Sequence, residues 1–186
     1  MQKYYRGFSL IELLVVLAII GIVSLIGVPS FNSAIRSSRL TTTVNDIVTD
    51  LSFARTEAIK RNQRVVMLKN QNNWAKGWTI FIDTDGNDAL DGAGDDAACA
   101  AGSDCILQIR PTLSSNYTLK FTGSKSQDLI RYDSSGMIND NNGTFYLCDN
   151  TDNNNRTEVN TAKLVVLNII GRASVSSPPT VSVSCI

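Results

Sequence analysis

Glu12 is the residue in this sequence whose surroundings most clearly require a charge partner. It is the only charged residue in an apolar run from Phe8 to Val28, and a carboxylate inside a membrane span costs on the order of 3 kcal/mol. The sequence presents a cleavable junction just ahead of the run, between Gly7 and Phe8. A cut there would create an amine at Phe8, about 6 Å along a helix from Glu12. Glu12 could then neutralise this amine in its own subunit or in a neighbouring one; an acidic residue that reaches back to water is the alternative.

The apolar run is long enough for a membrane-spanning helix. About 21 residues at about 1.5 Å each span the roughly 30 Å core of a bilayer, and two basic residues ahead of the run favour a cytoplasmic N-terminus. A secretory signal peptide is shorter and ends in a small-residue cleavage site, which the sequence after Val28 lacks. We therefore expect a leader at residues 1–7 and a retained transmembrane helix at residues 8–29. Pro29 removes a backbone hydrogen bond and should kink this helix.

The rest of the chain predicts an α+β domain. Residues 30–64 carry apolar side chains at spacings of three and four, which indicates an amphipathic helix. Its charged residues, Asp50 and Arg55 among them, lie mostly off the apolar stripe. Residues 65–186 alternate between short β-type runs and polar turns and form a predicted head, an antiparallel sheet packed on the helix. The predicted strands are 64–68, 77–82, 106–110, 117–121, 129–132, 144–147, 163–169 and a last one within 173–177 or toward residue 185.

Two features of the predicted head could serve in binding, but the sequence favours a structural role for each. Trp74, Trp78 and Phe81 could form an exposed aromatic platform, but strand alternation places Trp78 on one face with other apolar residues, which favours the core. The Asn-rich stretch at residues 139–143 predicts a solvated connector. A contact surface for another subunit is the alternative for that loop.

Composition excludes several kinds of site. The 186 residues contain no histidine, so a Ser-His-Asp triad, a Cys-His pair or a His-ligated zinc site cannot be built, and no phosphate-binding glycine motif appears. The chain has 17 basic and 17 acidic residues; without the leader's two basic residues the balance is 15 to 17, a net charge of −2. Such a domain does not bind nucleic acid by bulk charge. We expect no cofactor, and a structural or interaction protein rather than an enzyme.

Four cysteines, all beyond the apolar run, suggest two disulfides in an exported domain. They are Cys99, Cys105, Cys148 and Cys185, and three pairings are open. We favour Cys99–Cys105, which closes a small loop, and Cys148–Cys185, which ties the C-terminus to an earlier strand. The second bridge closes the longer loop and should stabilise by roughly 3–4 kcal/mol. A metal site is the weaker interpretation, since no C-x-x-C spacing occurs.

Carboxylates and amides crowd one predicted loop. Oxygen ligands on alternating residues could hold Ca²⁺. The register does not match an EF-hand, however, because the twelfth position is glycine rather than glutamate. A turn with an Asp-Gly-Asn core accounts for the same residues without metal, and we expect no metal site. The residues concerned are Asp83, Asp85, Asn87, Asp88 and Asp91.

The segment G-F-S-L-I-E-L-L-V-V-L-A-I-I-G-I at residues 7–22 resembles the class III signal of type IV pilins and type II secretion pseudopilins. In this signal Gly ends the leader, Phe begins the mature chain and Glu is fifth. The resemblance implies cleavage between Gly7 and Phe8 by prepilin peptidase, and N-methylation of Phe8. It also implies a salt bridge between Glu12 and the Phe8 amine of the adjacent subunit, with Pro29 bending or locally melting the helix inside the filament.

Two further stretches narrow the resemblance. A-R-T-E-A-I-K-R-N-Q at residues 54–63 and G-W-T-I-F-I-D-T-D-G-N at residues 77–87 are similar to the GspH/FimT family of minor pilins and pseudopilins, which includes FimU. The resemblance implies the type IV pilin fold: a long N-terminal helix, transmembrane in its first half and amphipathic in its second, packed on an antiparallel β-sheet head.

The resemblance also implies a function and a location. It predicts a minor pilin that primes pilus assembly at or near the filament tip and supports motility or adhesion. The implied partners are other minor pilins, the major pilin, prepilin peptidase and the inner-membrane assembly platform. The implied location is the inner membrane with the head in the periplasm, and later the filament.

Three other functions stay open. A type II secretion minor pseudopilin of the GspH kind is the nearest. Some FimT-like relatives bind DNA in natural transformation through a C-terminal G-R-x-R pattern, but this chain has Gly171, Arg172 and then Ser174 in place of the second Arg. One Arg supplies too few phosphate contacts, so we expect no nucleic-acid binding and place Arg172 at a strand end or against a partner subunit. The third is a signal-anchored periplasmic enzyme, which would require an uncleaved leader.

Overall fold

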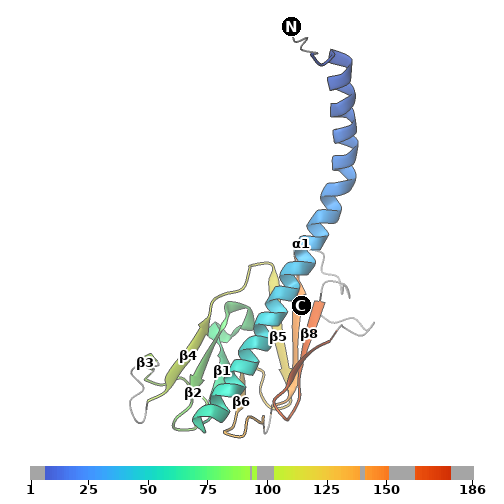
Figure 1. The fold of residues 1–186 in the computed structure, drawn as a ribbon. Helices are drawn as coiled ribbons and strands as arrows, with labels where there is room; N and C mark the ends of the chain where they lie inside the picture. Colours follow the sequence, from blue (N-terminus) through green and yellow to red (C-terminus); the bar gives the residue numbers. More distant parts are fainter. Residues whose placement is uncertain (1–6, 93, 96–102, 139–140, 151–161, 177–186) are drawn as a thin grey trace. The chain divides into compact units, whose positions relative to one another are not determined.

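One long helix and a set of short strands make up the protein (Figure 1). The computed structural model describes residues 7–92, 94–95, 103–138, 141–150 and 162–176, apart from the side chains of residues 25–33, 94 and 95. The chain divides into two compact units between Arg39 and Leu40. The elements are α1 (Leu10–Arg61), β1 (Val65–Lys69), η1 (Asn70–Asn72), η2 (Trp74–Lys76), β2 (Trp78–Ile82), β3 (Gly94–Asp95), β4 (Cys105–Arg110), β5 (Tyr117–Gly123), β6 (Leu129–Tyr132), β7 (Gly143–Asp149), β8 (Ala162–Leu167) and β9 (Ala173–Ser176).

The ends of α1 follow from local sequence. Ser9 precedes the helix, and its Oγ accepts a hydrogen bond from the Glu12 N–H at 3.3 Å, as an N-cap residue does. At the other end Asn62 takes a positive φ of 52° and Gln63 N–H bonds back to the Ala58 carbonyl at 3.2 Å, which is the Schellman termination. The helix passes through position 29 without interruption, and the kink predicted at Pro29 stays a prediction.

The first half of α1 exposes its apolar side chains on every side. The exposed residues run from Phe8, through leucines, valines and isoleucines, to Val23. Among the described residues, no helix offers an apolar stretch of membrane-spanning length.

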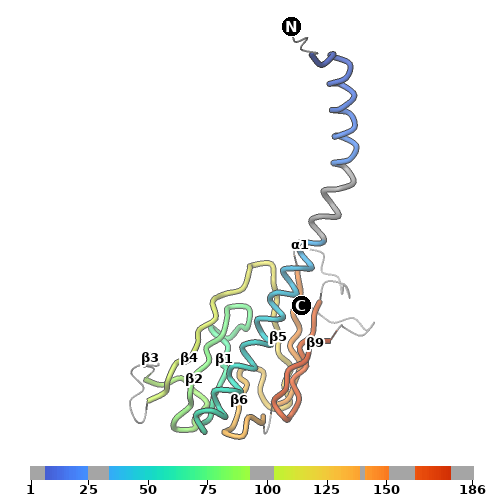
Figure 2. Tube along the Cα trace, viewed as in Figure 1, coloured from blue at the N-terminus to red at the C-terminus, as the bar shows by residue number. Residues whose placement is uncertain are grey.

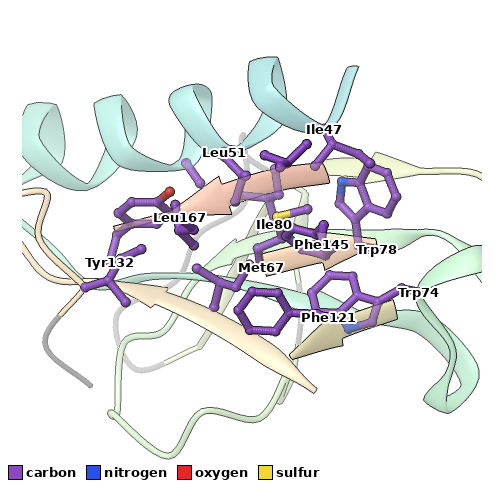
Figure 3. Close-up of a cluster of buried hydrophobic side chains, with 14 of the residues drawn as sticks. Ile47, Leu51, Met67, Trp74, Trp78, Ile80, Phe121, Tyr132, Phe145 and Leu167 are labelled. Carbon is purple, nitrogen blue, oxygen red and sulfur yellow. The ribbon is translucent and has the colours of Figure 1, made fainter. Parts of the chain in front are cut away.

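The second half of α1 buries one stripe in the core of the head. The stripe residues are spaced by three and four, as predicted, and all are less than 4% exposed: Leu40, Val44, Ile47, Leu51, Ala54 and Ala58. Figure 3 shows Ile47 and Leu51 projecting from the helix toward Met67 and Ile80 of the strands. Spacing of this kind places the side chains on one helix face, so the amphipathic pattern and the burial coincide.

The head contains two sheets where the sequence predicted one. The first sheet has the order β3-β4-β2-β1-β6 and the second β5-β7-β8-β9; Figure 2 traces the backbone through the strands of both sheets. All pairs are antiparallel except β3 with β4, which is parallel. Two sheets form because β5 pairs with β7 in the second sheet, whereas the next strand, β6, pairs with β1 in the first. The alternation of side chains along a strand shows which residues share a face, but it does not show which strands are neighbours. The division of the strands between two sheets therefore cannot be predicted from periodicity.

The aromatic residues of the head lie in the core, which confirms the prediction for Trp74, Trp78 and Phe81. β2 is buried along its whole length, so that both of its faces are covered. Trp74 meets Phe145 edge-on with ring centroids 5.0 Å apart, and its indole N–H donates to the Gln127 carbonyl at 2.7 Å. The core in Figure 3 thus joins α1 to both sheets.

Candidate functional site

Phe8 and Glu12 lie at the same end of α1. Phe8 is 81% exposed and precedes the helix, while Glu12 occupies the third helical position after the Ser9 cap. A carboxylate in the first turn faces the positive end of the helix dipole. This placement suits a carboxylate that neutralises an amine at Phe8. Cleavage after Gly7, methylation of Phe8 and the salt bridge of Glu12 stay predictions.

Asp83 organises the acidic loop that follows β2. Its buried carboxylate accepts hydrogen bonds from the N–H groups of Gly86, at 2.8 Å, and Asp88, at 3.3 Å. Arg64 Nη1 lies 3.3 Å from Asp83 Oδ2 and donates to the Gly86 carbonyl at 2.9 Å. Gly86 has a φ of +81°, a conformation that favours glycine. Beside it is a pocket of about 330 Å³ lined by Gln63, Arg64, Asp83, Thr84, Asp85 and Gly86.

The three carboxylates that lie closest together differ from the five residues that the sequence offered as possible calcium ligands. Within the described residues, Asp83, Asp85 and Asp104 each place one oxygen within 4.8 Å of the others. Asp104 is buried, and its oxygens accept from the N–H groups of Thr84 at 3.0 Å and Asp91 at 2.9 Å. The buried oxygens of this group therefore close the loop by hydrogen bonds to its backbone.

The other loop residues that were weighed as calcium ligands have different partners. Asn87 Nδ2 donates to Asp85 at 2.9 Å and to Asp91 at 2.7 Å. Asp88 binds Arg131 Nη1 through both oxygens, at 2.9 and 2.6 Å. In the sheet register Arg131 pairs with Val66, which in turn pairs with Phe81. The ion pair therefore draws the acidic loop over the outer face of the first sheet, where Val66 and Phe81 are buried.

Asp50 joins α1 to the first sheet through four hydrogen bonds. The side chain is 1% exposed and accepts from Trp78 Nε1 at 2.9 Å, Gln108 Nε2 at 2.9 Å, and Arg110 Nε and Nη2 at 2.8 and 2.5 Å. The hydrogen bonds that Arg110 donates to the Asp50 carboxylate hold the pKa of Arg110 above its ordinary value. The sequence placed Asp50 off the apolar stripe; it lies inside the head because strand side chains supply donors to it.

The two cysteines that the structure describes are oxidised. Cys105 and Cys148 are both disulfide-bonded, and among the described residues there is no free cysteine. Cys105 begins β4 in the first sheet and Cys148 lies near the end of β7 in the second. Cys99 and Cys185 lie outside the described residues, and the pairing stays a prediction.

Arg172 follows the turn between β8 and β9. Its N–H bonds to Asn168 Oδ1 at 2.8 Å, and its carbonyl accepts from the Asn168 N–H at 3.1 Å. The residue is exposed, and Ser174, the position of the missing second arginine, lies in β9. The backbone of Arg172 therefore closes the turn before the last described strand, and a contact of its side chain with a partner subunit stays a prediction.

Sequence reasoning missed three buried polar residues that set the local geometry: Asp50, Asp104 and Asn141. Asn141 Oδ1 accepts from the N–H groups of Lys125 and Ser126, and its amide donates to the Leu129 carbonyl at 2.6 Å. The loop that the sequence assigned to solvent thus contains a buried side chain. The available signal was that polar residues bordering strands often satisfy backbone groups, but it does not tell which of many asparagines does so.

Comparison with protein families identifies the class. The family model described as "Type II transport protein GspH" matches residues 43–168, and the "Prokaryotic N-terminal methylation motif" matches residues 2–28. The two together cover most of the chain, and the first alone covers more than half. The chain therefore belongs to the GspH family, and its N-terminal segment and family membership imply a membrane-anchored subunit of a pilus or pseudopilus.

Solved structures agree on the fold. Two crystal forms of the type IV minor pilin FimU from Pseudomonas aeruginosa (strain PAO1) each match with a TM-score of 0.52 and 16% identity. The matches cover 77% and 79% of this chain and 90% and 100% of the FimU chains. No curated protein matches the sequence. The head and helix thus have the type IV pilin fold, as the sequence predicted.

Proposed function

We propose that this chain is a minor type IV pilin that primes pilus assembly and is incorporated at or near the filament tip with other minor pilins. In this role it supports pilus-dependent motility and adhesion. The observation that carries the proposal is the exposed apolar first half of α1, with Glu12 in its first turn, on a chain of the GspH family. Exposed apolar surface on this scale needs a cover outside its own subunit. A membrane and then a bundle of neighbouring pilin helices supply one.

The proposed mechanism uses the two halves of the molecule separately. Residues 8–29 hold the subunit in the inner membrane, with the head in the periplasm, until the assembly platform inserts it into the filament. Prepilin peptidase cuts between Gly7 and Phe8, and Phe8 is then N-methylated. Glu12 neutralises the Phe8 amine of the adjacent subunit, which sets the register of insertion because an unpaired carboxylate in an apolar bundle is unfavourable. The head serves as a structural contact with other minor pilins and the major pilin, without a cofactor and without a catalytic role.

A clean deletion tests the proposal through two outputs in one strain, surface pili with twitching and the amounts of secreted exoproteins. We expect loss of pili with normal secretion. A plasmid-borne copy of the deleted gene should restore piliation. Normal pili together with normal secretion would contradict the proposal.

One observation favours a second candidate. The matching family model is named for type II transport, and a type II secretion minor pseudopilin would use the same anchor, processing and head. The same deletion separates the two, because a pseudopilin predicts normal pili with a secretion defect.

Two substitutions test the processing site and the carboxylate. A bulky residue at Gly7 should leave unprocessed precursor in the membrane, seen as a slower band on an immunoblot. Glu12→Ala should leave cleavage largely intact and sharply reduce the amount of the chain in sheared filaments. Normal incorporation of the Glu12→Ala protein would contradict the proposed salt bridge.

A further inference from the structure

Three segments of the head bring exposed apolar side chains together at the C-terminal end of α1. The isoleucine patch consists of Ile59 of α1, Met137 of the β6–β7 connection, and Ile169 and Ile170 of the β8–β9 turn. These four residues are between 38% and 52% exposed. Contiguous exposed apolar surface on a folded domain often marks a site of interaction.

The segments are held against one another by backbone contacts. Ile138 N–H bonds to the Ile169 carbonyl at 3.0 Å, and Arg55 Nε donates to the Gly136 carbonyl at 3.0 Å. A Cβ on Gly136 would lie 2.6 Å from Ile59 Cδ1, and one on Gly171 would lie 2.2 Å from the Gly136 carbonyl oxygen. Both glycines have φ near +76°. The patch is therefore fixed in place before any partner arrives, which lowers the entropic cost of binding.

The β8–β9 turn does not need its isoleucines in order to fold. Gly171 N–H bonds to the Asn168 carbonyl at 2.9 Å, so Ile169 and Ile170 occupy the two central positions of the turn. Turn positions favour Gly, Asn, Asp, Ser and Pro, and a β-branched apolar residue gains nothing there. The neighbouring turn at residues 133–136 has the sequence Asp-Ser-Ser-Gly, which is ordinary turn chemistry. The two isoleucines therefore point to a contact that the isolated chain does not make.

The charges around the patch are mainly positive. Arg172 is exposed immediately after the turn, and Lys60 is 69% exposed next to Ile59. Of the two carboxylates nearby, Glu57 pairs with both Lys60 and Arg61, so that this group keeps one positive charge in excess, and Asp133 accepts from the N–H groups of Ser135 and Met137. The patch thus has a cationic rim on a chain that is acidic once its leader is removed. An apolar surface bordered by carboxylates would be complementary to it.

We propose that the isoleucine patch is the docking surface for the head of a different pilin-family subunit, which covers it with apolar side chains bordered by Asp or Glu. The proposal rests on the proposed function, since it names the contact through which the head joins other minor pilins. A stable isolated dimer buries about 800 Å² per partner, more than four half-exposed side chains supply. The patch suits a partner that is already held beside this subunit by filament packing.

Photo-crosslinking in the intact filament tests the proposal. The full-length chain is produced in its own host with the photoreactive residue benzoylphenylalanine at position 170, and sheared filaments are irradiated and analysed by mass spectrometry. The control carries the same residue at position 109, because Ile109 on β4 is 61% exposed but lies outside the patch. We expect crosslinks from position 170 to another subunit with an N-terminal methylation motif, in a peptide that contains Asp or Glu. Crosslinks only to this chain itself, or only to lipid, would overturn the proposal.

Substitution gives a second, independent measurement. The double variant I169S/I170S should reduce the amount of the chain in sheared filaments by about tenfold, as loss of an interface centre does, while I109S should not. R172E should also reduce it, and replacing the crosslinked partner carboxylate by Lys should restore incorporation of R172E. If the unaltered chain is absent from filaments, the proposed function fails. If it is present and I169S/I170S is incorporated equally well, only the docking surface fails.

Discussion

The two halves of α1 meet opposite conditions within one continuous helix. In the first half Leu14 is 58% exposed, whereas Leu51 in the second half is fully buried. The first half has a single carboxylate, Glu12, in its first turn; the second half buries Asp50 among four hydrogen-bond donors. The second half of the helix is thus stabilised by contacts with this chain's own strands.

This difference teaches that apolar content alone does not define a core. The second half of α1 has fewer large apolar residues than the first, yet it is stable in the folded domain because its stripe meets two sheets. The first half carries more exposed apolar side chains than the second. Unfolding experiments on the purified, detergent-solubilised protein can separate the two, because both tryptophans of the chain, Trp74 and Trp78, lie in the head core and report on it alone.

The largest expected effect comes from Asp50→Ala. Removing this carboxylate leaves the buried Trp78 N–H and the partly buried Gln108 amide and Arg110 guanidinium without their acceptor. Breaking a buried charged pair in this way costs about 3–5 kcal/mol. Urea unfolding followed by tryptophan fluorescence should show the midpoint falling strongly. Asp46 is less buried, lies one helical turn earlier and acts on Arg110 through its charge alone, so Asp46→Ala is the comparison and should lower the midpoint less.

Leu51→Ala and Leu14→Ala test the comparison directly with the same chemical change. Leu51→Ala empties space in the core and should destabilise the head by about 2–5 kcal/mol. Leu14→Ala removes the same atoms from an exposed site in the other half of the helix and should leave the unfolding of the head unchanged. Equal effects of the two substitutions would show that the halves fold as one cooperative unit.

Reduction of the disulfides should have the next largest effect, and again only in the head. Cys105 and Cys148 are both disulfide-bonded, and native disulfides contribute roughly 2–4 kcal/mol each. A reducing agent should therefore lower the melting temperature recorded by tryptophan fluorescence. An unchanged melting temperature would mean that neither bridge constrains the unfolded head.

The smallest effect is a pH dependence from Glu57. The hydrogen bond from Arg61, with further help from Lys60, holds the pKa of Glu57 below its ordinary value of 4.5. A lowered pKa in the folded state means that the stabilisation is complete above about pH 4.5 and is lost as the pH falls through the folded-state pKa. The contribution should be under about 1 kcal/mol. Glu57→Gln should abolish this loss of unfolding free energy at low pH. Glu12→Gln, in the exposed half of the helix, should leave the loss unchanged.

Much of the secondary structure could be predicted because it depends on local pattern. The strand predicted at residues 129–132 coincides with β6, and most other predicted strands agree with the observed ones within one or two residues. The buried stripe from Leu40 to Ala58 follows from helical spacing alone. The strand pairing could not be predicted. The placement of β5 in one sheet and β6 in the other depends on contacts between distant segments.

The polar interior was harder to foresee than the apolar one. Asp50 and Asp104 look like surface carboxylates in the sequence, and they are buried because Trp78, Arg110 and loop N–H groups from elsewhere in the chain converge on them. A buried polar group is defined by its partners rather than by its neighbours in the sequence. The isoleucine patch was missed for the same reason, since its three segments meet only in the fold.

The Ser9 cap bears on how the precursor would mature. The bonds that start α1 run from Glu12 and Leu13 back to Ser9, and the scissile bond proposed between Gly7 and Phe8 precedes all of them. Gly7, Phe8 and Ser9 are not helical, so a peptidase could reach this bond without having to unwind the helix. Removal of the leader would then alter the electrostatic character of this end, by deleting two basic side chains and adding an amine, while precursor and product keep the same helix. Maturation of this subunit would be a change of charge at constant fold.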